Sequence, residues 1–186
     1  MDITPKLLKD CLAEKRRAQQ EMYRLCYPVM MSVCSRYERN QDDAEALLNQ
    51  AFLKVLTKLD TYKERVPFEA WLRRITLNTA IDQHRAKKRS KLDYHEEPGA
   101  ELELNDQVIN EAETKHDAEE LLGLIQKLPP MSQQVFNMYV IDGYNHKEIA
   151  QKLSMTEGTS KWHLSNARKN LKQMLHKLMN NVALLL

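Results

Sequence analysis

The stretch from residue 144 to residue 169 carries side chains that suit contact with nucleic acid. Its second half contains Thr159, Lys161, Trp162, Ser165 and Arg168. Hydroxyl groups and cations at helical spacing can reach the phosphates and base edges of a major groove. Trp162 is expected to face DNA, with packing against the first half of the chain as its alternative. The alternative for the whole group is a surface helix whose basic side is solvated.

A second group of polar residues lies upstream. Asn78 and Asp82 are one helical turn apart, so an amide and a carboxylate would share a face and could be offered to a base. Arg85, Lys87 and Lys88 continue along the same segment toward the phosphate backbone. The alternative is that Asn78 and Asp82 are ordinary surface residues.

Local signals predict the elements that would position the first group. The pattern is a short helix, a tight turn and a longer helix that begins near Glu157 and is capped by Thr156. Ile149 and Leu153 can fill the space between the helices, where the small Ala150 lets them cross. This arrangement is typical of a helix-turn-helix, which places its second helix in a major groove.

Helical patterns also cover the first half of the chain. Helix starts are expected at Thr4-Pro5, at Pro28, after residues 40–43 and at Pro67, and a further helical stretch carries Met22, Leu25 and Cys26. Proline suits the first turn of a helix and disrupts its interior, so Pro28 predicts a boundary between two helices. Residues 44–59 are expected to form one long amphipathic helix.

Composition predicts an all-α protein, and the length allows one ordinary domain or two small helical domains. The chain has only 4 Gly and 6 Pro among 186 residues, too few for a turn-rich β protein. Its net charge of +2 hides a basic cluster at residues 85–91 and an acidic block that follows it, an asymmetry that favours a polyanionic partner. The acidic block predicts a flexible linker. The expected parts are residues 1–92, a first helical domain; 93–117, the acidic linker; 118–180, a helix-turn-helix domain; and 181–186, a C-terminal tail.

Other functional classes find no support in the sequence. The histidines and the three cysteines lack the spacing of a metal site, so no metal and no cofactor are expected. There is no glycine-rich phosphate loop and no nucleophile elbow, so we expect no catalytic residue and no enzyme. The odd cysteine count and the lack of a membrane span predict a cytoplasmic protein that does not insert into membranes.

The motifs taken together resemble small sigma factors of the extracytoplasmic-function (ECF) type, in the sigma-70 family. The segments similar to sigma region 4 are Ile149-Ala150, Gly158-Thr159-Ser160-Lys161 and Ala167-Arg168-Lys169-Asn170-Leu171. Those similar to region 2 are Asp43-Ala44-Glu45 with Leu47, Gln50 and Phe52, and Phe68-Glu69-Ala70-Trp71-Leu72 with Ile75, Asn78, Ala80-Ile81-Asp82 and Arg85. The resemblance implies a region 2 bundle and a region 4 helix-turn-helix. It also implies a sigma factor that directs bacterial RNA polymerase to promoters and assists their opening.

The resemblance also implies roles for individual residues. Contacts to core RNA polymerase fall on Asp43, Glu45, Leu48, Asn49, Gln50 and Phe52. Contacts to minus-10 DNA fall on Lys63, Arg65, Asn78, Asp82, Arg85, Lys87 and Lys88. Contacts to minus-35 DNA fall on Lys147, Glu157, Thr159, Lys161, Trp162, Ser165 and Arg168. The resemblance implies core polymerase and promoter DNA as partners. It also makes an anti-sigma factor a plausible third partner.

Several positions depart from the family pattern. Ala51 replaces a common glutamate, Ser154 a common turn glycine and Ser160 a common valine. Trp162 and His163 replace a small polar residue and a basic residue. The minus-35 sequence that this protein recognises therefore cannot be inferred from the family.

Two other functions remain open at this point. A stand-alone helix-turn-helix regulator of LuxR type would need a receiver or ligand-binding domain, and residues 1–92 show no βα alternation. A helical adaptor that binds only protein would carry its basic cluster as a solvated face. Salt-sensitive DNA affinity would argue against that adaptor.

Overall fold

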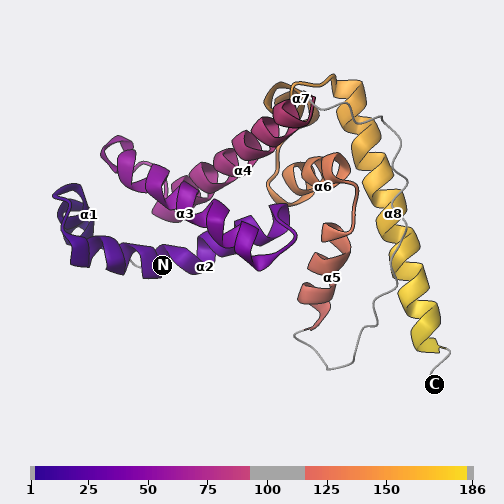
Figure 1. Cartoon of the computed structure of the whole chain (residues 1–186), viewed down its shortest axis with the longest axis horizontal. Coiled ribbons are helices and arrows are strands. Elements are labelled where there is room, and N and C mark those ends of the chain that lie inside the picture. Colours follow the sequence, from indigo (N-terminus) through magenta and orange to yellow (C-terminus); the bar gives the residue numbers. More distant parts are fainter. Residues whose placement is uncertain (1–2, 93–115, 184–186) are drawn as a thin grey trace. The chain divides into compact units, whose positions relative to one another are not determined.

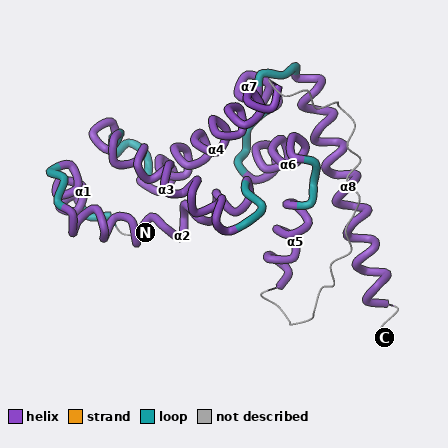
Figure 2. Tube along the Cα trace, viewed as in Figure 1, coloured by secondary structure: helices purple, strands orange, loops and turns teal. Residues whose placement is uncertain are grey.

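The computed structural model describes residues 3–92 and 116–183, and every regular element within these ranges is a helix (Figures 1 and 2). The expected all-α class is therefore confirmed. The chain divides into two units, residues 1–90 and 91–186, each described here by itself. The expected acidic linker lies outside the described residues apart from residues 116 and 117, which belong to a helix. No helix in the described part of the chain is long and apolar enough to cross a bilayer.

Unit 1 is a bundle built around one apolar core. Its elements are α1 (Pro5–Leu12), α2 (Arg16–Tyr37), α3 (Gln41–Thr57), the short 3-10 helix η1 (Leu59–Thr61) and α4 (Phe68–Leu92). The expected cap of α1 is confirmed, because the Thr4 hydroxyl accepts a hydrogen bond from the backbone N–H of Leu7 at 3.2 Å. Asn40 caps α3 in the same way, at 2.8 Å from the N–H of Asp43.

Helix α2 runs through Pro28 without a break, so the prediction of two helices there was wrong. The exposed Pro28 leaves the inward face of the helix intact. On that face Met22, Cys26 and Met30 are fully buried in one stripe. An interior proline costs about 3 kcal/mol. Burial of a large side chain contributes about 1.5–3 kcal/mol. The summed burial energy of the stripe is therefore larger than the energy that the proline costs.

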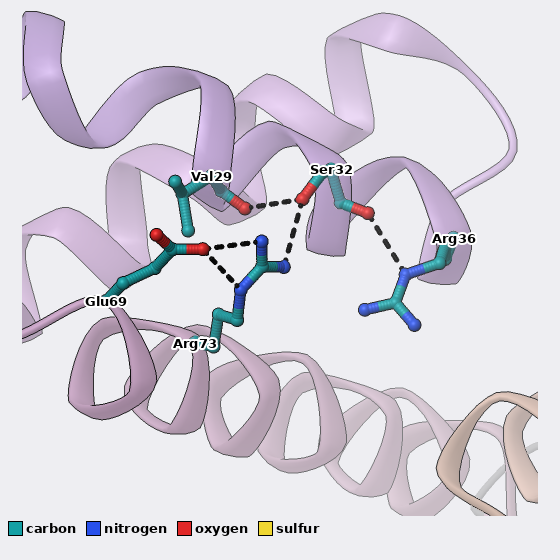
Figure 3. A network of polar contacts seen from close by, with 5 residues as sticks. All are labelled: Val29, Ser32, Arg36, Glu69 and Arg73. Atoms are coloured by element: carbon teal, nitrogen blue, oxygen red, sulfur yellow. Dashed lines mark hydrogen bonds and ion pairs between the residues drawn. The ribbon is translucent and has the colours of Figure 1, made fainter. Parts of the chain in front are cut away.

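A small network of exposed polar contacts links α4 to α2 (Figure 3). The Arg73 guanidinium pairs with Glu69 one turn earlier at 2.8 Å and donates to the Ser32 hydroxyl of α2 at 3.3 Å. The Ser32 hydroxyl donates in turn to the carbonyl of Val29 at 2.8 Å, and Arg36 donates to the carbonyl of Ser32 at 3.0 Å. Of these contacts, the Arg73–Ser32 hydrogen bond joins α4 to α2, and the others lie within one helix and orient its two partners.

Unit 2 is built around a long last helix. Its elements are α5 (His116–Gln126), α6 (Pro130–Phe136), the π turn η2 (Asn137–Ile141), α7 (His146–Leu153) and α8 (Glu157–Ala183). Leu124, Ile125 and Leu128 pack against Ala167 and Leu171 of α8. The short α7 and the long α8 are joined by three residues, which confirms the expected helix-turn-helix.

Candidate nucleic-acid interface

The turn between α7 and α8 is set by local hydrogen bonds. Asn145 and Glu148 form a capping box at the start of α7, with bonds of 2.9 and 2.8 Å. Ser154 ends α7 in the left-handed conformation, with φ 53° and ψ 52°. Thr156 caps α8, as expected, by accepting from the N–H of Thr159 at 3.0 Å. The two helices therefore meet at a defined angle, with Ile149, Ala150 and Leu153 buried on α7.

The structure exposes every residue for which a minus-35 contact was predicted. The exposed side chains are Lys147, Glu157, Thr159, Lys161, Trp162, Ser165 and Arg168. The opposite side of α8 is buried, with Ser160, Leu164, Ala167 and Leu171 turned to the core of unit 2. Helix α8 thus presents a basic, hydroxyl-rich face on a rigid support.

Two histidine–serine bonds hold α8 to the rest of unit 2. His146 Nδ1 lies 2.9 Å from the hydroxyl of the fully buried Ser160. His163 Nδ1 lies 3.1 Å from the hydroxyl of Ser132 on α6, and that hydroxyl also accepts from the Asn166 amide at 3.3 Å. Sequence reasoning noted Ser160 and His163 as departures from the family pattern and assigned neither a contact within the protein. In the structure both positions join α8 to a neighbouring helix.

The ring of His146 lies in surroundings that disfavour its charged form. It stacks on Tyr139 with ring centroids 4.5 Å apart. Desolvation by burial lowers the pKa of His146, and the nearby cations Lys161 and Arg168 lower it further, while Glu157 acts in the opposite direction. The neutral ring is therefore the form that bonds to Ser160 near pH 7.

In unit 1, the residues for which minus-10 contacts were predicted lie on α4 and on the loop before it. Asn78, Asp82 and Arg85 recur at helical spacing, so they share one side of α4. Arg74, one turn before Asn78, belongs to the same side and is exposed, although sequence reasoning missed it. The signal was available, since Arg74 and Asn78 are four residues apart. The side chains of Lys87 and Lys88, near the end of α4, lie outside the described residues.

Asp82 is not isolated on this face. Its carboxylate pairs with the Lys54 ammonium of α3 at 3.2 Å, and both side chains are exposed. Exposed ion pairs contribute about 0–1 kcal/mol, so opening this pair costs little. This pair also joins α3 to α4.

The loop before α4 is supported by aromatic rings. The exposed Lys63 and Arg65 lie in it, and the Tyr62 hydroxyl closes it by donating to the carbonyl of Val66 at 2.9 Å. Tyr62 also contacts Phe68 and Trp71, with ring centroids 5.1 and 5.3 Å apart. Trp71 is half-buried against the core, so it supports the loop from below.

Helix α3 presents only part of the predicted polymerase contact set. Asp43, Asn49 and Gln50 are exposed and Glu45 is half-exposed; the Asn49 side chain accepts from the hydroxyl of Tyr23 at 3.0 Å. Leu48 is 0% exposed and Phe52 is buried, because both point into the core of unit 1. These two residues therefore support α3 from inside and leave the contact set.

Sequence reasoning also missed one residue on the outward side of α3. Leu53 is 63% exposed, between Asn49 and the end of the helix. At about 100° per residue it lies opposite the buried face, next to Asn49 and Gln50. An exposed leucine beside two amides suits a protein partner better than DNA, because the core of a protein interface is depleted of charge.

Two family models match the chain, in the same order as the two units. Sigma-70 region 2 matches residues 22–90, and Sigma-70 region 4 matches residues 118–171. The chain belongs to the sigma-70 family. Members of this family are transcription initiation factors and not enzymes. The region 2 match accounts for the part of the chain in which a LuxR-type regulator would carry its receiver domain, so that alternative has no support.

Named relatives belong to the ECF group of this family. The chain is 28% identical to the ECF RNA polymerase sigma factor SigE of Mycolicibacterium smegmatis, over 90% of this chain and 62% of that protein. It is 29% identical to the ECF RNA polymerase sigma factor SigW of Bacillus subtilis, over 86% of each. Among solved structures, sigma factor RpoE of Bartonella quintana, in complex with the anti-sigma factor NepR, has a similar fold. The TM-score is 0.52 at 20% identity, covering 84% of this chain and 96% of that one. The predicted ECF membership is thereby confirmed.

Proposed function

We propose that this protein directs bacterial RNA polymerase to promoters through two separate DNA contacts. The proposal is carried by region 2 and region 4 matches on one chain, each on a helical unit with an exposed basic face. Core polymerase and promoter DNA are the partners, in the cytoplasm. An anti-sigma factor, such as the one crystallised with the solved relative, also belongs to the proposed partners.

Unit 2 is proposed to read the minus-35 element with the first turns of α8. The support is that Thr159, Lys161 and Ser165 are exposed there, on the side away from the buried face. Lys147 and Glu157 flank the turn, and Arg168 extends the basic face toward the phosphates. Each cation that contacts a phosphate makes binding more sensitive to salt.

Unit 1 is proposed to hold the minus-10 strand on α4 and the loop before it. Asn78 and Asp82 would contact an unstacked base, and Arg74, Arg85, Lys63 and Arg65 would contact phosphates. The Lys54–Asp82 pair, which is exposed, would open when the base arrives. Lys87 and Lys88 remain proposed phosphate contacts on the basis of the family resemblance alone.

The outward side of α3 is proposed to bind core polymerase. Asp43, Glu45, Asn49 and Gln50 form the polar part of this contact, and Leu53 supplies its apolar centre. The variant Leu53→Asp should therefore abolish co-elution with core polymerase without unfolding unit 1. Leu12→Asp is the matched control, since Leu12 is 52% exposed on α1 in the same unit.

Run-off transcription with purified core polymerase tests the proposal as a whole. Initiation from a defined start that depends on the protein is the expected result. Lys161→Ala should weaken promoter binding and reduce the slope of log affinity against log salt by about one. Lys177→Ala, an exposed lysine near the far end of α8, should leave both unchanged. A protein that neither binds core polymerase nor supports initiation would contradict the proposal.

A further inference from the structure

Trp162 projects from α8 directly away from the core of unit 2. Its indole is 61% exposed, the largest apolar surface on the face proposed to meet DNA. At about 100° per residue, Trp162 lies about 200° from the fully buried Ser160. It also lies within the first turns of the helix, the part that approaches base edges in helix-turn-helix proteins.

The indole is supported from one side. Its ring contacts that of His163 edge to face, with centroids 4.9 Å apart and planes at 76°. His163 is itself held to Ser132 on α6 at 3.1 Å, and Asn166 donates to the same hydroxyl. The orientation of the indole is therefore set by a chain of contacts that reaches into the domain. A side chain held in this way loses less conformational entropy on binding.

Space lies beside the indole on the same face. Gly158, one turn before Trp162, has no side chain, and a Cβ there would meet only the Thr156 hydroxyl, at 3.7 Å. The glycine is thus not required by packing within the protein. It allows another molecule to approach the backbone of α8 closely, next to the indole. The exposed cation Lys161 lies one turn from Gly158 and next to Trp162 in sequence, which favours a polyanion as the occupant.

The chemistry of an indole limits which part of DNA it can contact well. It offers one N–H donor and otherwise an apolar surface, which gains little from phosphate oxygens. In the major groove the apolar group at a base edge is the C5-methyl of thymine. We propose that Trp162 contacts the C5-methyl group of one thymine in the minus-35 element. This inference rests on the proposed function and assigns one base preference to one residue.

The test uses reconstituted polymerase holoenzyme with the full chain. Promoter fragments with a randomised minus-35 element are selected by binding to holoenzymes carrying the wild type or Trp162→Ala. The wild type should enrich thymine at one position, and Trp162→Ala should lose that preference while keeping the others. Trp162→Phe, which keeps an aromatic ring, should keep part of it.

A second measurement isolates the methyl group. Deoxyuridine replaces the selected thymine, which removes only the methyl. Wild-type affinity should fall about fourfold, the value of one buried methyl group. Trp162→Ala should bind both fragments equally, and Lys161→Ala should bind both more weakly with the ratio unchanged.

The outcomes separate this inference from the proposed function. No enrichment of thymine by the wild type, or an undiminished thymine-to-uracil ratio in Trp162→Ala, would overturn the inference and leave the sigma function standing. A holoenzyme that selects no promoter fragment at all would overturn both.

Discussion

The turn of the helix-turn-helix stores backbone strain that a single substitution should release. Ser154 has φ 53° and ψ 52°, and its N–H bonds to the carbonyl of Ala150 at the end of α7. A residue with a Cβ in this left-handed conformation costs about 1–2 kcal/mol. Glycine removes that cost. It also increases the conformational entropy of the unfolded chain, which lowers the free energy of unfolding by about 0.4–1 kcal/mol. Ser154→Gly should therefore stabilise unit 2 by about 0.5–1 kcal/mol.

Hydrogen exchange read by mass spectrometry can assign this gain to one unit. A gain of that size slows exchange in α7 and α8 by about two- to fivefold, if these helices exchange through opening of unit 2. Exchange in α1 to α4 should stay unchanged. Glu14→Gly is the matched control, because Glu14 has φ 54° after α1 and should slow exchange only in unit 1. Faster exchange of α7 and α8 in Ser154→Gly would refute the strain argument, since it would mean that glycine acts there only through the unfolded chain.

Three further predictions concern buried groups. Because the pKa of His146 is lowered in the folded state, the unfolded chain binds the proton more readily, and unit 2 should lose stability as pH falls through about 6.5. Urea unfolding at a series of pH values should show a flatter dependence for His146→Gln, and equal slopes would contradict the assignment. Leu48→Ala should lower the unfolding free energy of unit 1 by about 2–5 kcal/mol, whereas the exposed Gln50→Ala should change it by less than about 0.5 kcal/mol, again by urea unfolding. Burial raises the pKa of Cys26 and of Cys34 to about 12, so iodoacetamide at mildly alkaline pH should label them only after denaturation. Peptide mass spectrometry checks this, and rapid labelling of the native protein would show that the thiols are accessible.

Most helix starts of this protein could be predicted because their causes are local. The Thr4, Asn40 and Thr156 caps each depend on a side chain and an N–H three residues away. The helix-turn-helix was predictable for the same reason, since a short apolar pattern and one cap define it. Family membership followed from the order of two such local motifs along the chain.

Pro28 and Leu48 show where local information fails. The proline was expected to end a helix, but burial of the residues around it keeps α2 continuous. Leu48 was expected at a partner contact, but the core of unit 1 encloses it. In both cases the deciding energy comes from packing against other helices, which no short window of sequence contains.

The sequence by itself determined most helix starts, the Thr4, Asn40 and Thr156 caps and the family, because these depend on residues a few positions apart. The tertiary structure alone decided which side of each helix is free to bind. It also decided that His146 holds Ser160 across 14 positions and that Ser132 holds His163 across 31. Such bonds form only when distant segments are brought within about 3 Å by the folding of the whole unit, and this is why Trp162 projects outward on a fixed support.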